Sequence, residues 1–130
     1  MTVNDLRIWQ MARDLSIAIH KMTMDLPRFE QFEVGSQIRR SSKSIRSNIV
    51  EGYGRRYYKK EFVRFIIFAL ASNYETKDHL DTLFETGSLA NAELYESLRA
   101  RIDDLGAGLN SFLKAIIRNH TPPDFMKGLI

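Results

Sequence analysis

The sequence predicts an all-α protein that folds as an antiparallel, up-down-up-down four-helix bundle. Apolar residues recur three and four positions apart in four segments, which is the pattern of amphipathic helices. No segment alternates apolar and polar residues as a half-buried strand does, and 3 Pro and 7 Gly in 130 residues are too few for many strand turns. The length suits one core, so residues 1–120 are expected to form a single domain. Short links between long helices favour antiparallel neighbours.

The first predicted helix begins at Asn4, whose side chain can cap the free amides of a first turn. It ends at Leu26, because the residue before Pro27 is disfavoured in the helical conformation. Residues 28–33 are predicted to form a loop with two aromatic side chains. The apolar face of this helix comprises Ile8, Met11, Ala12, Leu15, Ile19, Met22 and Leu26.

The second predicted helix runs from Val34 to Tyr53, and Gly54 ends it. Several positions on its inner face hold small residues, which allow a neighbouring helix to approach closely. That face comprises Ile38, Ser41, Ser42, Ile45, Asn48, Ile49 and Gly52.

The third and fourth predicted helices run from Lys60 to Thr86 and from Ala90 to Asn119. Gly87 suits a left-handed cap between them. The inner face of the third helix comprises Phe62, Phe65, Ile66, Ala69, Asn73, Thr76, Leu80 and Leu83. The fourth helix carries a heptad seam of Tyr95, Leu98, Ile102, Leu105, Leu109, Phe112 and Ile116. Residues 121–130, with two prolines, are expected to form an extended tail.

Two helices carry apolar residues beyond those that an inner face needs. They are Val63, Ile67, Leu70 and Tyr74 in the third helix and Leu6, Trp9, Ile17 and Met24 in the first. Single exposed apolar residues are common on any surface. Contiguous ones mark interfaces, however, and the stripe on the third helix is continuous. We therefore predict that the chain forms a homo-oligomer with closed symmetry.

Positive charge is concentrated in one stretch of the chain. Residues 39–60 hold eight basic residues and one acidic residue, a net charge of +7; since the whole chain carries +3, the remainder carries −4. Such a local field favours an anionic partner. The basic residues are Arg39, Arg40, Lys43, Arg46, Arg55, Arg56, Lys59 and Lys60.

Helical geometry places Arg39, Lys43 and Arg46 within about 60° of one another, with Arg40 beside them, opposite the isoleucines. Arrays of this kind bind phosphate backbones. The following turn adds Tyr53, Tyr57 and Tyr58, which are able to stack on unpaired bases. The alternative interpretation is a solvated helix face whose tyrosines cover the end of the bundle.

Residues 37–56 carry a pattern that resembles a known family. The run QIRRSSKSIRSNIVEGYGRR is similar to the Q-hydrophobic-R-R-A-A-x-S-I-x-x-N-I-x-E-G-x-G signature of the four-helix bundle proteins of 23S ribosomal RNA intervening sequences. Trp9 with Ala12, Leu26-Pro27 and the run ASNYETKDHL at residues 71–80 also fit. Two features depart from the signature: Ser41 and Ser42 replace alanines, and Arg46 replaces a frequent proline.

The resemblance implies a closed homo-oligomer, typically a pentamer. Similar bundles that accompany diversity-generating retroelements bind nucleic acid and a reverse transcriptase. Carried over to this chain, the signature implies structural roles for Ser44, Asn48, Glu51 and Gly52. It implies a surface for polyanions at Arg39, Arg40, Arg55 and Arg56.

Catalytic and metal chemistry find little support in the sequence. No Cys is present, and Glu75 with His79 lacks the inward Glu-x-x-His pairs of di-iron bundles. Asn48 is expected to bond to a neighbouring helix and Glu51 to pair with Arg55. Arg13 and His20 loosely fit the spacing of certain helical RNases, an interpretation that we place last.

The sequence therefore predicts a non-enzymatic, nucleic-acid-binding homo-oligomer without a cofactor or metal. The alternative is an oligomeric adaptor that docks an acidic protein partner. The longest apolar run, residues 65–71, is far shorter than the roughly 20 residues of a membrane span. With no leader-like start and no Cys, a cytoplasmic location is expected.

Overall fold

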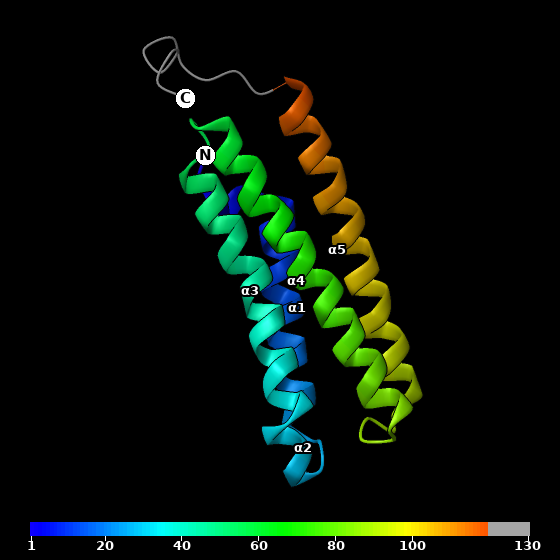
Figure 1. Cartoon of the computed structure of the whole chain (residues 1–130). Helices are drawn as coiled ribbons and strands as arrows, with labels where there is room; N and C mark the ends of the chain where they lie inside the picture. The colour runs from blue at the N-terminus through cyan, green and yellow to red at the C-terminus, as the bar shows by residue number, and fades with distance from the viewer. Residues whose placement is uncertain (120–130) are drawn as a thin grey trace.

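The computed structural model describes residues 1–119, and these form helices without any strand. The all-α prediction is confirmed, with four long helices and two short ones (Figure 1). In chain order the elements are η1 (Val3–Asp5), α1 (Arg7–Met24), α2 (Arg28–Phe32), α3 (Val34–Gly54), α4 (Lys59–Glu85) and α5 (Ala92–Asn119). The predicted tail, residues 121–130, lies outside the described residues.

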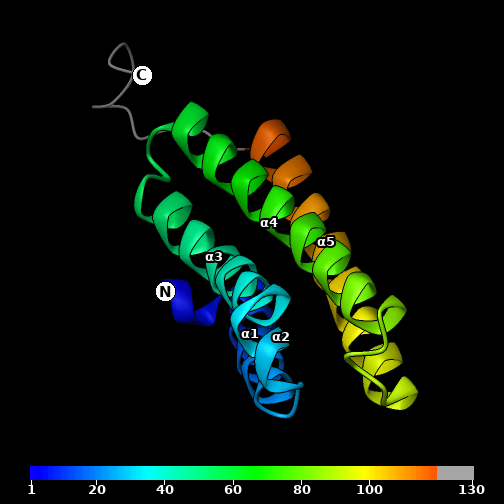
Figure 2. The same cartoon turned by 60° about the horizontal axis from the view of Figure 1, so that its bottom comes forward.

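Each long helix packs against two others. α3 contacts α1 and α4, and α5 contacts α4 and α1. Both views place α2 and the α4–α5 loop at one end of the molecule and the α3–α4 turn at the other (Figures 1 and 2). No helix among the described residues is both long and apolar enough to cross a membrane.

The predicted inner faces of the four long helices form the core. Every long helix contributes large side chains that are almost fully buried, and the isoleucines of α3 are 0% exposed. These side chains are Leu15, Ile19, Ile38, Ile45, Ile49, Ile66, Leu80, Leu83, Leu98, Ile102, Leu105 and Leu109. The three- and four-residue spacing therefore identified most of the core, which also contains Trp9, Leu70 and Leu89.

Several helix ends differ from the prediction. Asn4 does not cap α1, because it lies within the 3-10 turn η1, where the Thr2 amide donates to Asp5 Oδ2 at 2.8 Å. The last helix begins at Ala92, two residues later than predicted. Asn91, the residue before it, accepts a hydrogen bond at Oδ1 from the Leu94 amide at 3.0 Å. Gly87 adopts φ +83°, which confirms the left-handed turn expected there.

Residues 28–32 form the helix α2 where a loop was predicted. Its Glu30 is buried, with a carboxylate that accepts hydrogen bonds from Ser88 Oγ at 2.7 Å and from the Val34 amide at 3.3 Å. The first bond reaches the loop between α4 and α5, and the second reaches the start of α3. Glu30 thus fixes the end of the bundle that lies opposite the α3–α4 turn.

Candidate nucleic-acid interface

Two cations of α3 that were predicted to face outward are engaged within the chain. Arg39 donates to Thr23 Oγ1 of α1 at 3.0 Å and to the Gln31 carbonyl of α2 at 2.7 Å. Arg46 reaches Ser16 Oγ at 3.4 Å, with its guanidinium carbon 5.4 Å from the centre of the Trp9 ring. Both side chains are half-buried, so they tie α3 to its neighbours.

Three other cations remain exposed and unpaired. The side chains of Arg40, Lys43 and Lys60 make no hydrogen bond or ion pair with any residue from 1 to 119. Arg40 and Lys43 lie in the first half of α3, and Lys60 is the second residue of α4. These groups are able to bind external anions without breaking a contact within the described chain.

The α3–α4 turn holds the remaining cations in ordered positions. Arg56 donates to the Tyr53 carbonyl at 3.0 Å, and its guanidinium carbon lies 4.3 Å from the centre of the Tyr53 ring and 4.9 Å from that of Tyr57. Lys59 Nζ donates to the Ile117 carbonyl of α5 at 2.7 Å. Tyr57 and Tyr58 are exposed. The turn therefore presents a guanidinium between two phenol rings, beside a second exposed ring.

The family-signature residues have structural contacts at the α3–α4 boundary. Asn48 Nδ2 donates to the Ser44 carbonyl and hydroxyl of its own helix, at 2.9 and 3.1 Å. The bond to α4 is made by Ser44, whose hydroxyl lies 2.9 Å from that of Ser72. This corrects the expectation that Asn48 bonds across helices. Glu51 pairs with Arg55, as the four-residue spacing predicted.

Gly52 is buried where α3 crosses α4. A Cβ at this position would lie 3.1 Å from Phe65 Cβ, so a side chain would press against the facing helix. Arg55, one turn away, places its guanidinium carbon 4.6 Å from the centre of the same Phe65 ring. The small residue and the cation thus set how α3 ends and how the turn begins.

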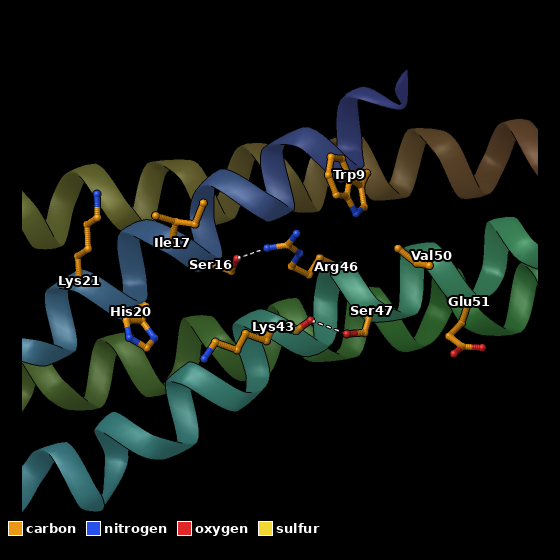
Figure 3. A pocket seen from close by; sticks show the side chains of 10 residues that line it. All are labelled: Trp9, Ser16, Ile17, His20, Lys21, Lys43, Arg46, Ser47, Val50 and Glu51. Atoms are coloured by element: carbon orange, nitrogen blue, oxygen red, sulfur yellow. Dashed lines mark hydrogen bonds between the residues drawn. The ribbon is translucent and has the colours of Figure 1, made fainter. Parts of the chain in front are cut away.

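A groove of about 660 Å³ lies between α1 and α3 (Figure 3). From α1 it is lined by Trp9, Ser16, Ile17, His20 and Lys21. From α3 it is lined by Lys43, Arg46, Ser47, Val50 and Glu51. The sequence had assigned some of these residues to nucleic acid and others to a subunit interface, and the fold brings them together. We call this feature the α1–α3 groove.

The predicted oligomer surface is only partly exposed. Ile67, Tyr74 and Ile17 are 46%, 63% and 45% exposed. Trp9 and Leu70 instead belong to the chain's own core, which corrects their placement on the outer surface. Val63 and Leu6 are half-buried and pack against that core.

Further exposed apolar residues lie outside the predicted oligomer surface. Val50 and Phe68 are exposed, and so are Phe29 and Phe32 of α2. Helix periodicity gave no signal for Val50, which falls among the polar residues of α3. The two α2 residues had been predicted to lie in a loop. Val50 is the residue among these that lines the α1–α3 groove.

Residues considered for chemistry are dispersed. Among residues 1–119 no group of three or more His, Asp or Glu side chains is arranged to hold a metal ion. Glu75 and His79 lie 3.3 Å apart as a pair on α4. Arg13 pairs with Asp14 at 3.0 Å and stacks on Trp9, whereas His20 lines the groove. Arg13 and His20 therefore have different surroundings.

The pKa values of two side chains are shifted where α4 packs against α5. Tyr95 Oη donates to Asp81 Oδ1 at 2.7 Å, and Arg99 Nε lies 3.2 Å from the same oxygen. The hydrogen bond to Asp81 raises the pKa of Tyr95 above its ordinary value. The charge of Asp81 likewise raises the pKa of Arg99. The Tyr95 ring also stacks on Phe84, with centroids 4.0 Å apart.

Comparisons with known proteins agree with the fold. The model of the family described as 23S rRNA-intervening sequence protein matches residues 4–111. A solved structure, a protein of unknown function from the S23 ribosomal protein family of Bacteroides thetaiotaomicron, is 25% identical with a TM-score of 0.76. That similarity covers 88% of this chain and 99% of the other. No curated protein matches the chain.

Proposed function

The chain belongs to the family of 23S rRNA-intervening sequence proteins, and from this membership we propose that it is a non-enzymatic, homo-oligomeric bundle that binds RNA or DNA. The surface we assign comprises Arg40 on α3 and Arg56, Tyr57, Tyr58 and Lys60 at the α3–α4 turn. Arg39 and Arg46 are left out, because their guanidinium groups are engaged with other helices.

The arrangement of the α3–α4 turn is the observation that carries this proposal. Arg56 is already held between the Tyr53 and Tyr57 rings, so little side-chain freedom is lost when it meets a phosphate. The Tyr57 and Tyr58 rings are 43% and 44% exposed, which leaves area for base stacking. Lys60 adds an exposed, unpaired ammonium group. Stacking and phosphate contacts together favour single-stranded nucleic acid.

Self-association forms the second part of the proposal. The exposed side chains of Ile17, Ile67 and Tyr74 support it, since large apolar residues at an open surface are typical of interfaces. The family resemblance adds a closed, typically pentameric assembly of up-down-up-down bundles. Light scattering on the purified chain measures the number of subunits in the assembly directly.

A salt series with a fluorescent single-stranded RNA tests nucleic-acid binding. We expect affinity to fall steeply with salt, because each bound phosphate releases counterions. In an Arg56→Ala, Lys60→Ala variant the slope of log K against log salt should flatten by about 1.4, at about 0.7 per lost contact. An Arg28→Ala, Arg101→Ala variant loses the same charge from α2 and α5 and should keep the slope.

Two outcomes count against the nucleic-acid proposal. One is the absence of binding to RNA and DNA at low salt with tens of micromolar protein. The other is an equal change of slope in both double variants, which would mean that net charge alone attracts the RNA. In the first case the adaptor hypothesis applies, in which the basic surface docks an acidic protein such as a reverse transcriptase.

A further inference from the structure

We infer that the exposed side of α4 packs into the α1–α3 groove of a second copy of the chain. This inference takes the proposed self-association as its starting point and assigns the surfaces that form it. It does not depend on nucleic-acid binding.

The exposed side of α4 carries an ordered series of charges and apolar groups, which we call the α4 ridge. Arg64 lies toward the α3–α4 turn, Ile67 and Tyr74 lie in the middle, and Glu75 and Asp78 follow. All five side chains are exposed. Among residues 1–119 the partners of Arg64 and Glu75 all lie within α4: Arg64 pairs with Glu61 at 3.5 Å and lies over the Phe65 and Phe68 rings, and Glu75 lies 3.3 Å from His79. The ridge thus runs from positive through apolar to negative.

The α1–α3 groove carries the opposite series. Glu51 and Val50 lie toward the α3–α4 turn, Arg46 and Lys43 follow along α3, and Ile17 and then Lys21 lie toward the other end along α1 (Figure 3). Val50 and Ile17 are 44% and 45% exposed, so the apolar middle of the groove is open. In the same direction along the bundle, the groove thus runs from the negative Glu51, through Val50 and Ile17 with the half-buried Arg46 between them, to the positive Lys21.

Hydrogen bonds between helices show which residues share a level along the bundle axis. Ser44 lies beside Ser72, with hydroxyls 2.9 Å apart, and Thr76 donates to Ser41 at 2.8 Å. Residue 75 of α4 is therefore level with residues 41–44 of α3. By the same count Ile67 is level with Val50.

Two further contacts complete the register. Gly52 lies against Phe65, which makes Arg64 level with Tyr53 and places it about two residues from Glu51 along the bundle axis. Arg46 reaches Ser16 and Arg39 reaches Thr23, which makes Lys21 of α1 level with residues 41–42. Each group on the α4 ridge consequently has a groove residue of opposite charge or like apolarity within about two residues, or roughly 3 Å, along the bundle axis.

A second copy needs only to rotate about an axis along the bundle, without sliding, to bring the two series together. Because the ridge and the groove are different surfaces, the contact is heterologous and closes into a ring when the rotation divides the circle evenly. The contact would cover Lys43 and Arg46. Arg40 and Arg56 belong neither to the groove lining nor to α4, so they stay available in the assembly, whereas Lys60 lies one helical turn before Arg64 on α4.

Charge reversal tests the pairing. The wild-type chain should scatter light as an oligomer, and Glu75→Lys, Asp78→Lys should reduce the mass toward that of one chain, since lysines then face Lys21 and Lys43. Adding Lys21→Glu and Lys43→Glu should restore the oligomer. All four positions are exposed, and an unchanged circular dichroism spectrum verifies the fold.

Each other outcome overturns a defined part of the inference. A monomeric wild type removes the self-association itself. An oligomer that the α4 reversals leave intact refutes this interface but retains assembly. If Lys60→Glu and Arg64→Glu restore the oligomer of the α4 variant, and Lys21→Glu and Lys43→Glu do not, the contact is an antiparallel pairing of α4 with α4 of a second copy.

Cysteine cross-linking provides a second readout, because the chain has no native Cys. A Val50→Cys, Ile67→Cys double variant should form disulfide-linked multimers under mild oxidation, whereas either single variant should stay unlinked. Efficient linking of Ile67→Cys alone would contradict the heterologous contact and indicate that two α4 ridges face each other.

Discussion

Neighbouring residues of one basic stretch have different roles in this protein. Arg39 donates two hydrogen bonds, to Thr23 Oγ1 and to the Gln31 carbonyl, and so joins α1, α2 and α3. Arg40, the next residue, is exposed and makes no side-chain bond within the described chain. A helix rotates by about 100° per residue, which is enough to turn one guanidinium inward and the next outward.

This difference leads to a stability prediction. Arg39→Met should lower the free energy of unfolding by about 2 kcal/mol, because bonds from a charged donor are lost and two acceptors, the buried Thr23 hydroxyl and the Gln31 carbonyl, lose a partner. Arg40→Met serves as the matched control and should change stability by less than about 0.5 kcal/mol. Urea unfolding measures both. Equal effects would mean that the Arg39 bonds contribute nothing to the folded state.

The sequence identified the cations but not their partners. A helical wheel placed Arg39 on the outward side, since it contains no information on where α2 returns along α3. Trp9 was likewise assigned to the surface, yet it is buried, with the Arg13 and Arg46 guanidinium carbons 5.2 and 5.4 Å from its ring centre. Leu70 lies one turn before Asn73, which bonds to the Ile102 carbonyl, and so borders α5. These contacts depend on tertiary positions.

At the scale of elements, α3 and α4 approach closely because the facing side chains are small. Gly52 faces Phe65, and the hydroxyls of Ser41 and Ser44 bond to Thr76 and Ser72 of α4. The hydroxyls satisfy each other across the contact, so polar groups in this interface need no water. The close approach also fixes the register between α3 and α4, and this register sets the position of the α4 ridge along the bundle axis.

Two glycines of α3 provide a matched test of that approach. Gly52→Ala should be less stable than Gly54→Ala by about 1–2 kcal/mol, because a Cβ at Gly52 lies 3.1 Å from Phe65 Cβ whereas nothing lies within 4 Å at Gly54. Gly52 is interior to α3 and gains more helix propensity from Ala than Gly54, the last residue of α3, so a lower stability of Gly52→Ala is attributable to packing. Thermal or urea unfolding of both variants provides the comparison. Equal stability would show that α4 relaxes without cost.

The long helices were predictable from sequence, and the short ones were not. Periodicity over many turns identifies a helix such as α5, but α2 has five residues and no repeating face. α2 is fixed by Glu30, whose carboxylate bonds to Ser88, 58 positions later in the chain. η1 arises from a local bond between Thr2 and Asp5, which moved the start of α1 beyond the expected Asn4 cap.

At the scale of the whole molecule, the α3–α4 turn of the nucleic-acid proposal and the two surfaces of the assembly proposal lie in different parts of the bundle; Arg40 alone lies away from the turn, in the first half of α3. The α3–α4 turn lies at one end, whereas the α4 ridge and the α1–α3 groove lie along its length (Figure 1). Copies related by rotation about an axis that lies outside the bundle and runs along it present their turns at the same rim. A long nucleic acid is then able to contact several turns at once, which raises its affinity through effective concentration.

This arrangement predicts that assembly strengthens binding to long RNA only. The dissociating Glu75→Lys, Asp78→Lys variant should bind a long single strand at least about tenfold more weakly than the wild type, because avidity is lost. A short oligonucleotide that reaches one turn should bind both proteins with similar affinity. Fluorescence anisotropy with the two RNA lengths measures the ratio.

The charge of the variant makes the test stringent. Replacing two acids by two lysines adds positive charge, which by itself strengthens binding to any RNA. Weaker binding of the long strand is therefore attributable to dissociation, and restoring the oligomer with Lys21→Glu and Lys43→Glu should recover the affinity. If the monomeric variant keeps full affinity for the long strand, each α3–α4 turn acts independently and the shared rim has no role in binding.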